Sequence, residues 1–217
     1  YCTIDVAIGD TQAKNFNLID RPFAADITRG LWPSISVLDD CIVASVADVN
    51  GVNLKRGLLR RDMSSDGKSI VMAADSRRLC KATVKHESGK LIVDCNLFFA
   101  SAYSFTAKDN YLTIYIDSEN NRWTKPSDGC FKVRCNLEGS VQVFNGVNGE
   151  WEEANETNAT ASFTKSDDNT YKGSIAIPFS NTSGTARIAV EMENRFSKTI
   201  TPLSDSLRPY TWCKLSL

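Results

Sequence analysis

The chain carries few residues of the types that act as catalytic nucleophiles, bases or paired carboxylates, and their spacing in the sequence does not match a known catalytic arrangement. Its single histidine, His86, stands beside a predicted hairpin turn, where an exposed imidazole is a simpler interpretation than a general base. The Gly-Ser steps at Gly139 and Gly173 lack the second glycine of a nucleophile elbow. Paired acidic residues are adjacent, so on a strand they would face opposite ways: Asp39-Asp40, Glu152-Glu153 and Asp167-Asp168. We therefore expect no enzymatic activity.

Seven cysteines are scattered without any Cys-x-x-Cys pair, so the sequence does not indicate a zinc site. Cys95, Cys130 and Cys135 fall in strand-like runs. Cys130 and Cys135 would point to opposite faces of one strand and cannot pair with each other. We expect most cysteines to be reduced and buried as small hydrophobic residues, with a disulfide framework as the alternative.

Oxygen-bearing side chains alternate in one short segment, at Asp117, Glu119 and Asn121. Hard cations such as calcium favour ligands of this kind. The segment lacks an acidic closing ligand at a fixed spacing, so a capped turn is the alternative. Calcium is the one ion that the sequence suggests, and we expect no organic cofactor.

Four tryptophans stand in or beside predicted loops or at a strand start: Trp32, Trp123, Trp151 and Trp212. Flat rings on loops can stack on the apolar faces of sugars, while the hydroxyls bind polar side chains. The same rings at strand ends can instead plug the core, and for Trp151 and Trp212 both interpretations stay open. Trp123, between Arg122 and Lys125, has the most exposed setting.

The composition excludes several other classes of protein. The chain has 217 residues, with 42% hydrophobic and 24% charged residues, which is ordinary for a globular protein. A net charge of −1 argues against a nucleic-acid partner, which usually requires a basic excess. No apolar run is long enough to span a membrane. The sequence opens without methionine or a signal-like stretch, so we expect it to be a segment of a longer protein.

The elements that must position these residues are predicted to be strands. Short runs rich in Val, Ile, Tyr and Phe alternate with Gly, Asn, Asp and Ser, whereas helical periodicity is nearly absent. The predicted strands cover residues 41–47, 68–74, 80–86, 90–96, 111–117, 131–136, 140–145, 159–164, 171–177, 186–192 and 211–217. Residues 12–39 show no clear strand and leave room for a short helix.

Strands at this spacing predict an all-β fold, an antiparallel, jelly-roll-like β-sandwich with an inserted β-hairpin region. We expect a single domain over residues 1–217. Residues 22–73 have denser turn signals and a basic run at 55–61, and on their own they would bury only a marginal core. We therefore interpret them as an elaboration or insertion on the sandwich.

The order of several segments resembles a known family. The segments are an opening strand and loop at 7–15, a hairpin at 81–94, the strand and loop 111–120, the strand 128–136, Tyr171-Lys-Gly-Ser-Ile-Ala-Ile-Pro-Phe179, and the terminus Arg208-Pro-Tyr-Thr-Trp-Cys-Lys-Leu-Ser-Leu217. Together they resemble the family 9 carbohydrate-binding modules and the related DOMON-like sandwiches. The nearest likeness is to the C-terminal modules of secreted bacterial carbohydrate-active proteins, and it covers residues 81–217 best.

The resemblance implies sugar binding by aromatic rings without catalysis. Family members clamp a saccharide between two tryptophans in loops that correspond here to residues 100–110 and 201–210. Neither loop contains tryptophan, so Tyr103, Phe105 and Tyr210 would stand in for them. Lys132 and Arg134 would donate hydrogen bonds to hydroxyls or to an acidic sugar. The expected ligand-binding residues are Tyr103, Phe105, Trp123, Lys132, Arg134, Arg208 and Tyr210.

The first hypothesis is therefore a non-catalytic, carbohydrate-binding-like module of a larger secreted glycan-processing protein. It would be extracellular or on the cell surface, and its partners would be a polysaccharide or oligosaccharide and an adjacent domain. The alternative is a structural C-terminal sandwich that packs on a neighbouring domain without ligand. A haem-binding DOMON-like domain is disfavoured, because axial ligation would need His86 with one of three methionines.

Overall fold

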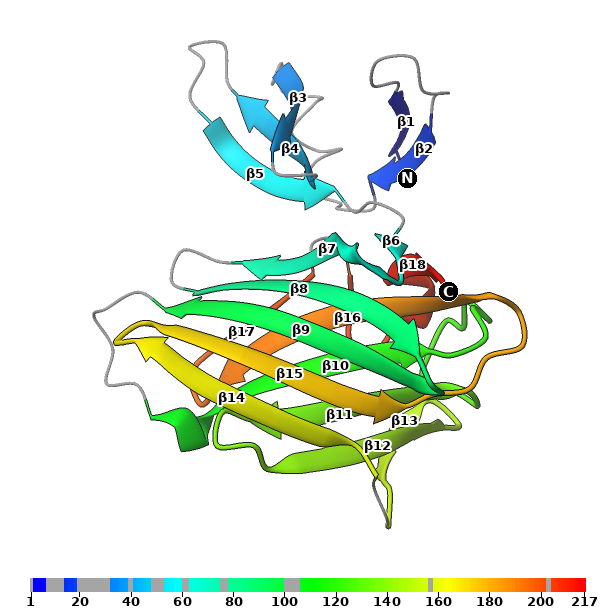
Figure 1. The fold of residues 1–217 in the computed structure, drawn as a ribbon. Helices are drawn as coiled ribbons and strands as arrows, with labels where there is room; N and C mark the ends of the chain where they lie inside the picture. The colour runs from blue at the N-terminus through cyan, green and yellow to red at the C-terminus, as the bar shows by residue number, and fades with distance from the viewer. Residues whose placement is uncertain are drawn as a thin grey trace. The chain divides into compact units, whose positions relative to one another are not determined.

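The computed structural model describes residues 2–6, 14–18, 32–38, 41–47, 53–59, 63–74, 78–99, 106–155, 158–201 and 204–217, and for residues 2–59 it describes the backbone alone. The chain divides into two compact units, residues 1–61 and 62–217. The first unit holds a two-stranded and a three-stranded antiparallel sheet, both drawn in blue and cyan in Figure 1. Its strands are β1 (Cys2–Val6), β2 (Lys14–Leu18), β3 (Trp32–Leu38), β4 (Cys41–Ala47) and β5 (Asn53–Leu59).

The second unit is a sandwich of two sheets that face each other (Figure 1). One sheet has eight strands in the order β13-β12-β11-β10-β16-β18-β6, with β17 also paired to β16. These strands are β6 (Met63–Ser64), β10 (Asn110–Asp117), β11 (Cys130–Asn136), β12 (Val141–Val147), β13 (Glu150–Glu153), β16 (Thr185–Asn194), β17 (Lys198–Ile200) and β18 (Cys213–Ser216).

The other sheet has five strands in the order β14-β15-β9-β8-β7. They are β7 (Asp66–Ala74), β8 (Arg78–Glu87), β9 (Lys90–Phe99), β14 (Thr160–Asp167) and β15 (Thr170–Pro178). Two short 3₁₀ helices, η1 (Ala107–Asp109) and η2 (Pro209–Thr211), lie in the connections. The predicted all-β antiparallel sandwich is confirmed, and the one parallel pairing among the described strands is the short contact of β18 with β6.

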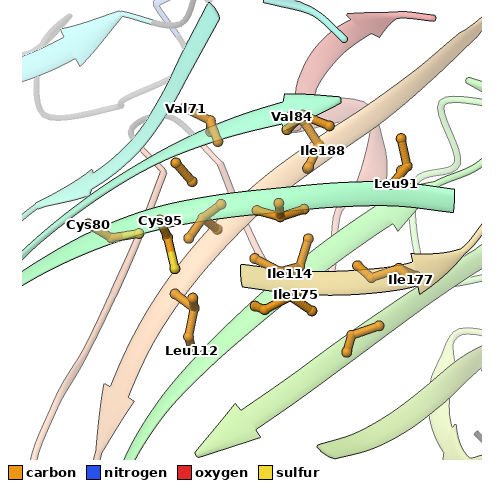
Figure 2. Close-up of a cluster of buried hydrophobic side chains, with 14 of the residues drawn as sticks. Val71, Cys80, Val84, Leu91, Cys95, Leu112, Ile114, Ile175, Ile177 and Ile188 are labelled. Carbon is orange, nitrogen blue, oxygen red and sulfur yellow. The ribbon is translucent and has the colours of Figure 1, made fainter. Parts of the chain in front are cut away.

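The core lies between the two sheets because alternate residues of most of their strands are apolar and face inward. In β10 the inward residues are Leu112, Ile114 and Ile116, each with at most 1% of its surface exposed. Figure 2 shows Ile114 close to Ile175 of the opposite sheet. Burial of side chains of this size contributes about 1.5–3 kcal/mol each, so this layer is the main source of the sandwich's stability.

The hairpin predicted around Gly89 is confirmed. Glu87 of β8 pairs with Lys90 of β9, which leaves a two-residue loop. Ser88 and Gly89 have φ values of 52° and 72°, the left-handed conformation that a type I′ turn requires at both positions. Glycine at the second position adopts this conformation without strain.

The N-terminal part of the chain differs from the expectations in two ways. Residues 12–39 contain β2 and β3, so the expectation that they lack strands was wrong. Pro33 and two serines weaken the strand signal of β3, but β3 is at the edge of its sheet, where proline is tolerated. In addition, β6 and β7 belong to the sandwich, although residues 22–73 were expected to elaborate it. The single-domain organisation over 1–217 stays a prediction.

The outer face of the eight-stranded sheet

Lys132 and Arg134 lie on the outer face of the eight-stranded sheet, on the opposite side from the core. Val133, between them on β11, is fully buried in the core, and strand alternation directs its two neighbours outward. The register places Lys132 opposite Tyr115 of β10 and Phe144 of β12. The sheet therefore brings these two predicted site residues together on one face.

The Lys132 ammonium lies over two aromatic rings. Its Nζ is 4.5 Å from the ring centroid of Phe144 and 5.2 Å from that of Trp151. The side chain is half-buried, and burial lowers the pKa of the ammonium from its usual value. The negative charge of Glu191 opposes this shift but is outweighed. The arrangement is a partly desolvated cation held against π faces.

Arg134 is engaged on several sides. Its guanidinium carbon lies 3.5 Å from the ring centroid of Tyr111, in a stacking geometry. Its Nη2 forms an ion pair with Glu193 Oε2 at 3.3 Å, and its Nη1 donates to Gln142 Oε1 at 3.4 Å. These contacts hold the guanidinium over the ring.

A small aromatic cluster adjoins Lys132 on the same face. Tyr115, Trp151 and Trp212 have ring centroids 5.5–6.4 Å apart, and the two indole planes are inclined by only 12°. Trp212 is fully buried, and its Nε1 donates to the carbonyl of Asp205 at 2.8 Å. Trp151 is half-buried, and its Nε1 is shielded from solvent without a hydrogen-bond partner among the described residues. The two tryptophans therefore share a cluster but differ in the pairing of their N–H groups.

Glu191 of β16 provides a carboxylate beside the cluster. Its Oε1 accepts a hydrogen bond from the Tyr115 hydroxyl at 3.0 Å. Its Oε2 has no hydrogen-bond partner in the described structure, and the Lys198 Nζ lies 3.8 Å away. Burial raises the pKa of this carboxyl above its usual value, and burial followed by the Glu191 charge raises the pKa of the Tyr115 hydroxyl. A buried donor and a buried acceptor that lack hydrogen-bond partners in the described structure thus occur on the same face of the sheet.

We call this surface the platform, and it consists of Tyr111, Lys132, Arg134, Phe144, Trp151 and Glu191. The sequence predicted Lys132 and Arg134 but not the other four as a site. Period-two alternation in β10 and β12 could have indicated Tyr111 and Phe144, since each alternates with residues that pack toward the core. For Trp151, the structure gives features of both open interpretations, because its ring packs on Trp212 while its N–H stays unpaired.

Three predicted residues lie in two connections, Trp123 between β10 and β11, and Arg208 and Tyr210 between β17 and β18. Trp123 is 41% exposed, as its setting suggested, and its Nε1 donates to the Asp128 carbonyl at 3.0 Å. Tyr210, half-buried in η2, donates its backbone N–H to the Trp123 carbonyl at 3.1 Å. Arg208 is exposed and pairs with Asp205 at 3.4 Å. Their role in ligand binding stays a prediction, and Tyr103 and Phe105 lie outside the described residues.

The predicted calcium segment is a capped turn in the structure. Asp117 is fully buried, and its two carboxylate oxygens accept the backbone N–H groups of Asn121 and Arg122 at 3.0 and 2.9 Å. Glu119 accepts the backbone N–H of Thr182 at 3.0 Å, and that bond is the main reason that its pKa is lowered. No group of three or more His, Cys, Asp or Glu side chains suited to a metal ion occurs in the described part of the chain. This geometry favours the capped turn.

The remaining chemistry-bearing residues are buried or peripheral. His86 is exposed at the end of β8, with its ring edge-on to Phe179 at 5.4 Å. Within the described residues the free cysteines are all buried: Cys80, Cys95, Cys130, Cys135 and Cys213. Cys130 and Cys135 face opposite sides of β11, as expected. No helix of the described structure is long and apolar enough to cross a membrane.

Comparison with known proteins identifies a fold relationship. No protein-family model and no curated protein matches the chain. Among solved structures, the chain is similar to a family 9 carbohydrate-binding module from Caldicellulosiruptor kristjanssonii in complex with cellotriose, with a TM-score of 0.50 and 12% identity over 73% of this chain and 89% of that one. A glucose complex of a family 9 module from the same organism gives a TM-score of 0.48 and 13% identity over 68% and 80% of the two chains. The sandwich therefore has a fold like that of family 9 carbohydrate-binding modules.

Proposed function

We propose that the sandwich unit is a non-catalytic carbohydrate-binding module that holds an oligosaccharide on the platform. The observation that carries this proposal is that neither the buried indole N–H of Trp151 nor the buried Oε2 of Glu191 has a hydrogen-bond partner among the described residues, although the Lys198 Nζ lies 3.8 Å from that oxygen. An unpaired buried polar group costs about 1–3 kcal/mol, so its retention calls for an explanation. A sugar hydroxyl both donates and accepts, and neighbouring hydroxyls could pair with both atoms.

The rings of the platform supply the other half of sugar recognition. Phe144, Trp151 and Tyr111 are half-buried on a solvent-side face and alternate with the long polar side chains Lys132 and Arg134. Saccharides present apolar CH surfaces and a rim of hydroxyls, which match rings with interleaved donors. Because Lys132 covers two of the rings, its flexible side chain must move aside to admit a ligand. The fold likeness to a module bound to cellotriose supports this class of ligand.

The same proposal places the chain in a larger, secreted glycan-processing protein, at or outside the cell surface. In that setting the module would keep a catalytic partner near its polysaccharide. The DOMON-like relationship and the C-terminal position belong to this proposal as well. Binding is expected to be weak, about millimolar, because stacking of one ring contributes about 1 kcal/mol beyond its buried area.

A structural role without ligand is the second candidate, and a specific observation favours it. Tyr115 and Trp212 are only 4% and 0% exposed and form a small core with Ala189 on the outer face. A cluster of this kind can fix the C-terminal loop on the sheet without binding any ligand.

Affinity electrophoresis of the full chain in gels containing cellulose derivatives, xylan, mannan or pectin separates these candidates. We expect retardation by at least one polysaccharide, lost in Phe144→Ala. Phe98→Ala is the matched control, because Phe98 is a 43% exposed ring on the five-stranded sheet.

Each outcome of this assay has a defined meaning. Loss in Tyr210→Ala but not in Phe144→Ala would move the ligand to the loop site predicted from the sequence. Absence of retardation for the unmutated chain in every gel would favour the structural role. Thermal melts of each variant separate a lost contact from a lost fold.

A further inference from the structure

The charges of the outer face are unequally compensated. Arg134 is paired with Glu193 at 3.3 Å, and Lys198 lies 3.8 Å from Glu191. Lys132 has no carboxylate within ion-pair distance among the described residues, although its Nζ lies over two rings of the platform. Both nearby carboxylates are thus already engaged with other cations.

The surroundings of Lys132 make this lack of a partner costly. Its Nζ faces the rings of Phe144 and Trp151, which attract a cation but accept no conventional hydrogen bond. Burial is the largest influence on its pKa and lowers it. Among the charged groups that face it, Glu191 and Glu193 favour the ammonium form and Arg134 and Lys198 oppose it. Within the described part of the chain, a half-buried ammonium with three donors and no paired anion therefore lies beside a Trp151 N–H without a hydrogen-bond partner.

We propose that the platform selects saccharides that carry a carboxylate, such as uronic-acid units, and that Lys132 Nζ binds this group. The inference rests on the proposed sugar-binding function and adds the charge of the ligand. The ligand carboxylate would accept hydrogen bonds from Lys132, while Glu191 Oε2 accepts one from a ring hydroxyl. Arg134 would stay paired with Glu193 and would hold the Tyr111 ring in position, so that the ring orients the sugar.

The energetic reason is the strength of a charge-assisted hydrogen bond. Bonds between ammonium and carboxylate are about twice as strong as those between neutral groups. A neutral sugar would offer only hydroxyl oxygens and would leave the Lys132 charge without its counter-ion.

The test compares trigalacturonic acid with its fully methyl-esterified form, in which each carboxylate is a neutral methyl ester, and uses cellotriose as a third ligand. Isothermal titration of the full chain at low salt should give at least tenfold tighter binding of the acid than of the ester, equivalent to about 1.4 kcal/mol. Lys132→Gln should reduce the affinity for the acid to that for the ester. Lys172→Gln, an exposed lysine on the five-stranded sheet, should leave the preference unchanged.

A second measurement reports on Lys132 directly. NMR titration of the chain with isotope-labelled lysine side chains should show the pKa of Lys132 rising when the acid binds, because an adjacent anion favours the charged form. The ester should produce no such rise.

The outcomes separate the inference from the function on which it rests. Equal binding of acid and ester, or an acid preference that survives Lys132→Gln, would overturn the inference and leave sugar binding intact. Binding of cellotriose alone would have the same meaning. Failure of all three ligands to bind in titration, together with no retardation in any gel, would overturn both.

Discussion

Replacement of each clustered tryptophan by phenylalanine tests whether the Trp151 N–H is truly unpaired. Trp151→Phe and Trp212→Phe remove the same atoms from two rings of one cluster whose planes are inclined by 12°. The Trp212 N–H donates to the Asp205 carbonyl at 2.8 Å, whereas the Trp151 N–H has no partner in the described structure. The two substitutions therefore differ chiefly in the fate of one hydrogen-bond donor.

The expected magnitudes follow from this difference. Loss of the additional ring atoms costs about 1–1.5 kcal/mol where the ring is fully buried, and less for the half-buried Trp151. Trp212→Phe also loses a hydrogen bond and leaves the Asp205 carbonyl unpaired, which brings the total to about 2–4 kcal/mol. Trp151→Phe removes an unpaired buried donor, a gain of about 1–3 kcal/mol that offsets or exceeds the ring loss. The two variants should differ by at least about 2 kcal/mol.

Urea denaturation followed by circular dichroism measures the difference, provided that the slope m is the same for both variants. In thermal melts the gap corresponds to about 4–8 °C for a chain of this size. Equal destabilisation by the two substitutions would refute the argument, because it would mean that the Trp151 N–H is paired in the native state. The main support for sugar binding at the platform would then be lost.

Three further predictions concern the sandwich. Glu191→Gln should raise the melting temperature at neutral pH, because the raised pKa of Glu191 means that the native state loses stability as pH rises through that pKa. The gain should disappear toward about pH 4, below the usual glutamate pKa, and the control substitution Glu138→Gln at an exposed position should give no gain. Gly146→Ala should lower the free energy of unfolding, measured in urea, by about 1–3 kcal/mol, because the added Cβ would lie 2.7 Å from the Ser127 backbone nitrogen. Gly89→Ala is the control: its Cβ would meet no atom within 4 Å, so only the backbone strain at φ of 72° remains, about 1 kcal/mol. Ellman titration should find most of the seven cysteines free in denaturant. In the native protein at pH 8, Cys80, Cys95, Cys130 and Cys135 should react slowly, because burial raises the pKa of each thiol, to about 12 for the last three. Fewer than four free thiols in denaturant would contradict the last prediction.

Most strands of the sandwich could be predicted because their hydrophobic pattern is local. The run at 111–117 alternates cleanly, and the structure has β10 at Asn110–Asp117. β13 and β17 escaped prediction for a physical reason. Glu150–Glu153 is largely acidic and Lys198–Ile200 is very short, so neither shows a pattern, and both are strands only because a neighbour supplies the hydrogen bonds.

The platform could be predicted only as far as it lies on one strand. Lys132 and Arg134 share a face of β11 by alternation alone, whatever the neighbouring strands are. Phe144 joins them through the register of β12, and Trp151 through that of β13. Trp212 reaches Tyr115 because the C-terminal loop folds over β16. Register and loop packing depend on contacts far apart in the sequence, which a pattern of single residues does not encode.

The alternation of β11 also separates stability from recognition. Val133 and Cys135 face the apolar core, whereas Lys132 and Arg134 face outward from the same backbone. The core residues fix the position of the strand, and with it the spacing of the two cations, to within the tolerance of close packing. The outer side chains need not contribute to that packing, so they are free to keep arrangements that cost stability, such as the Lys132 ammonium, which has no counter-ion among the described residues. This division is the reason that we propose a ligand for the outer face, whereas burial raises the pKa of the Cys95 and Cys135 thiols and so disfavours their reactive thiolate form.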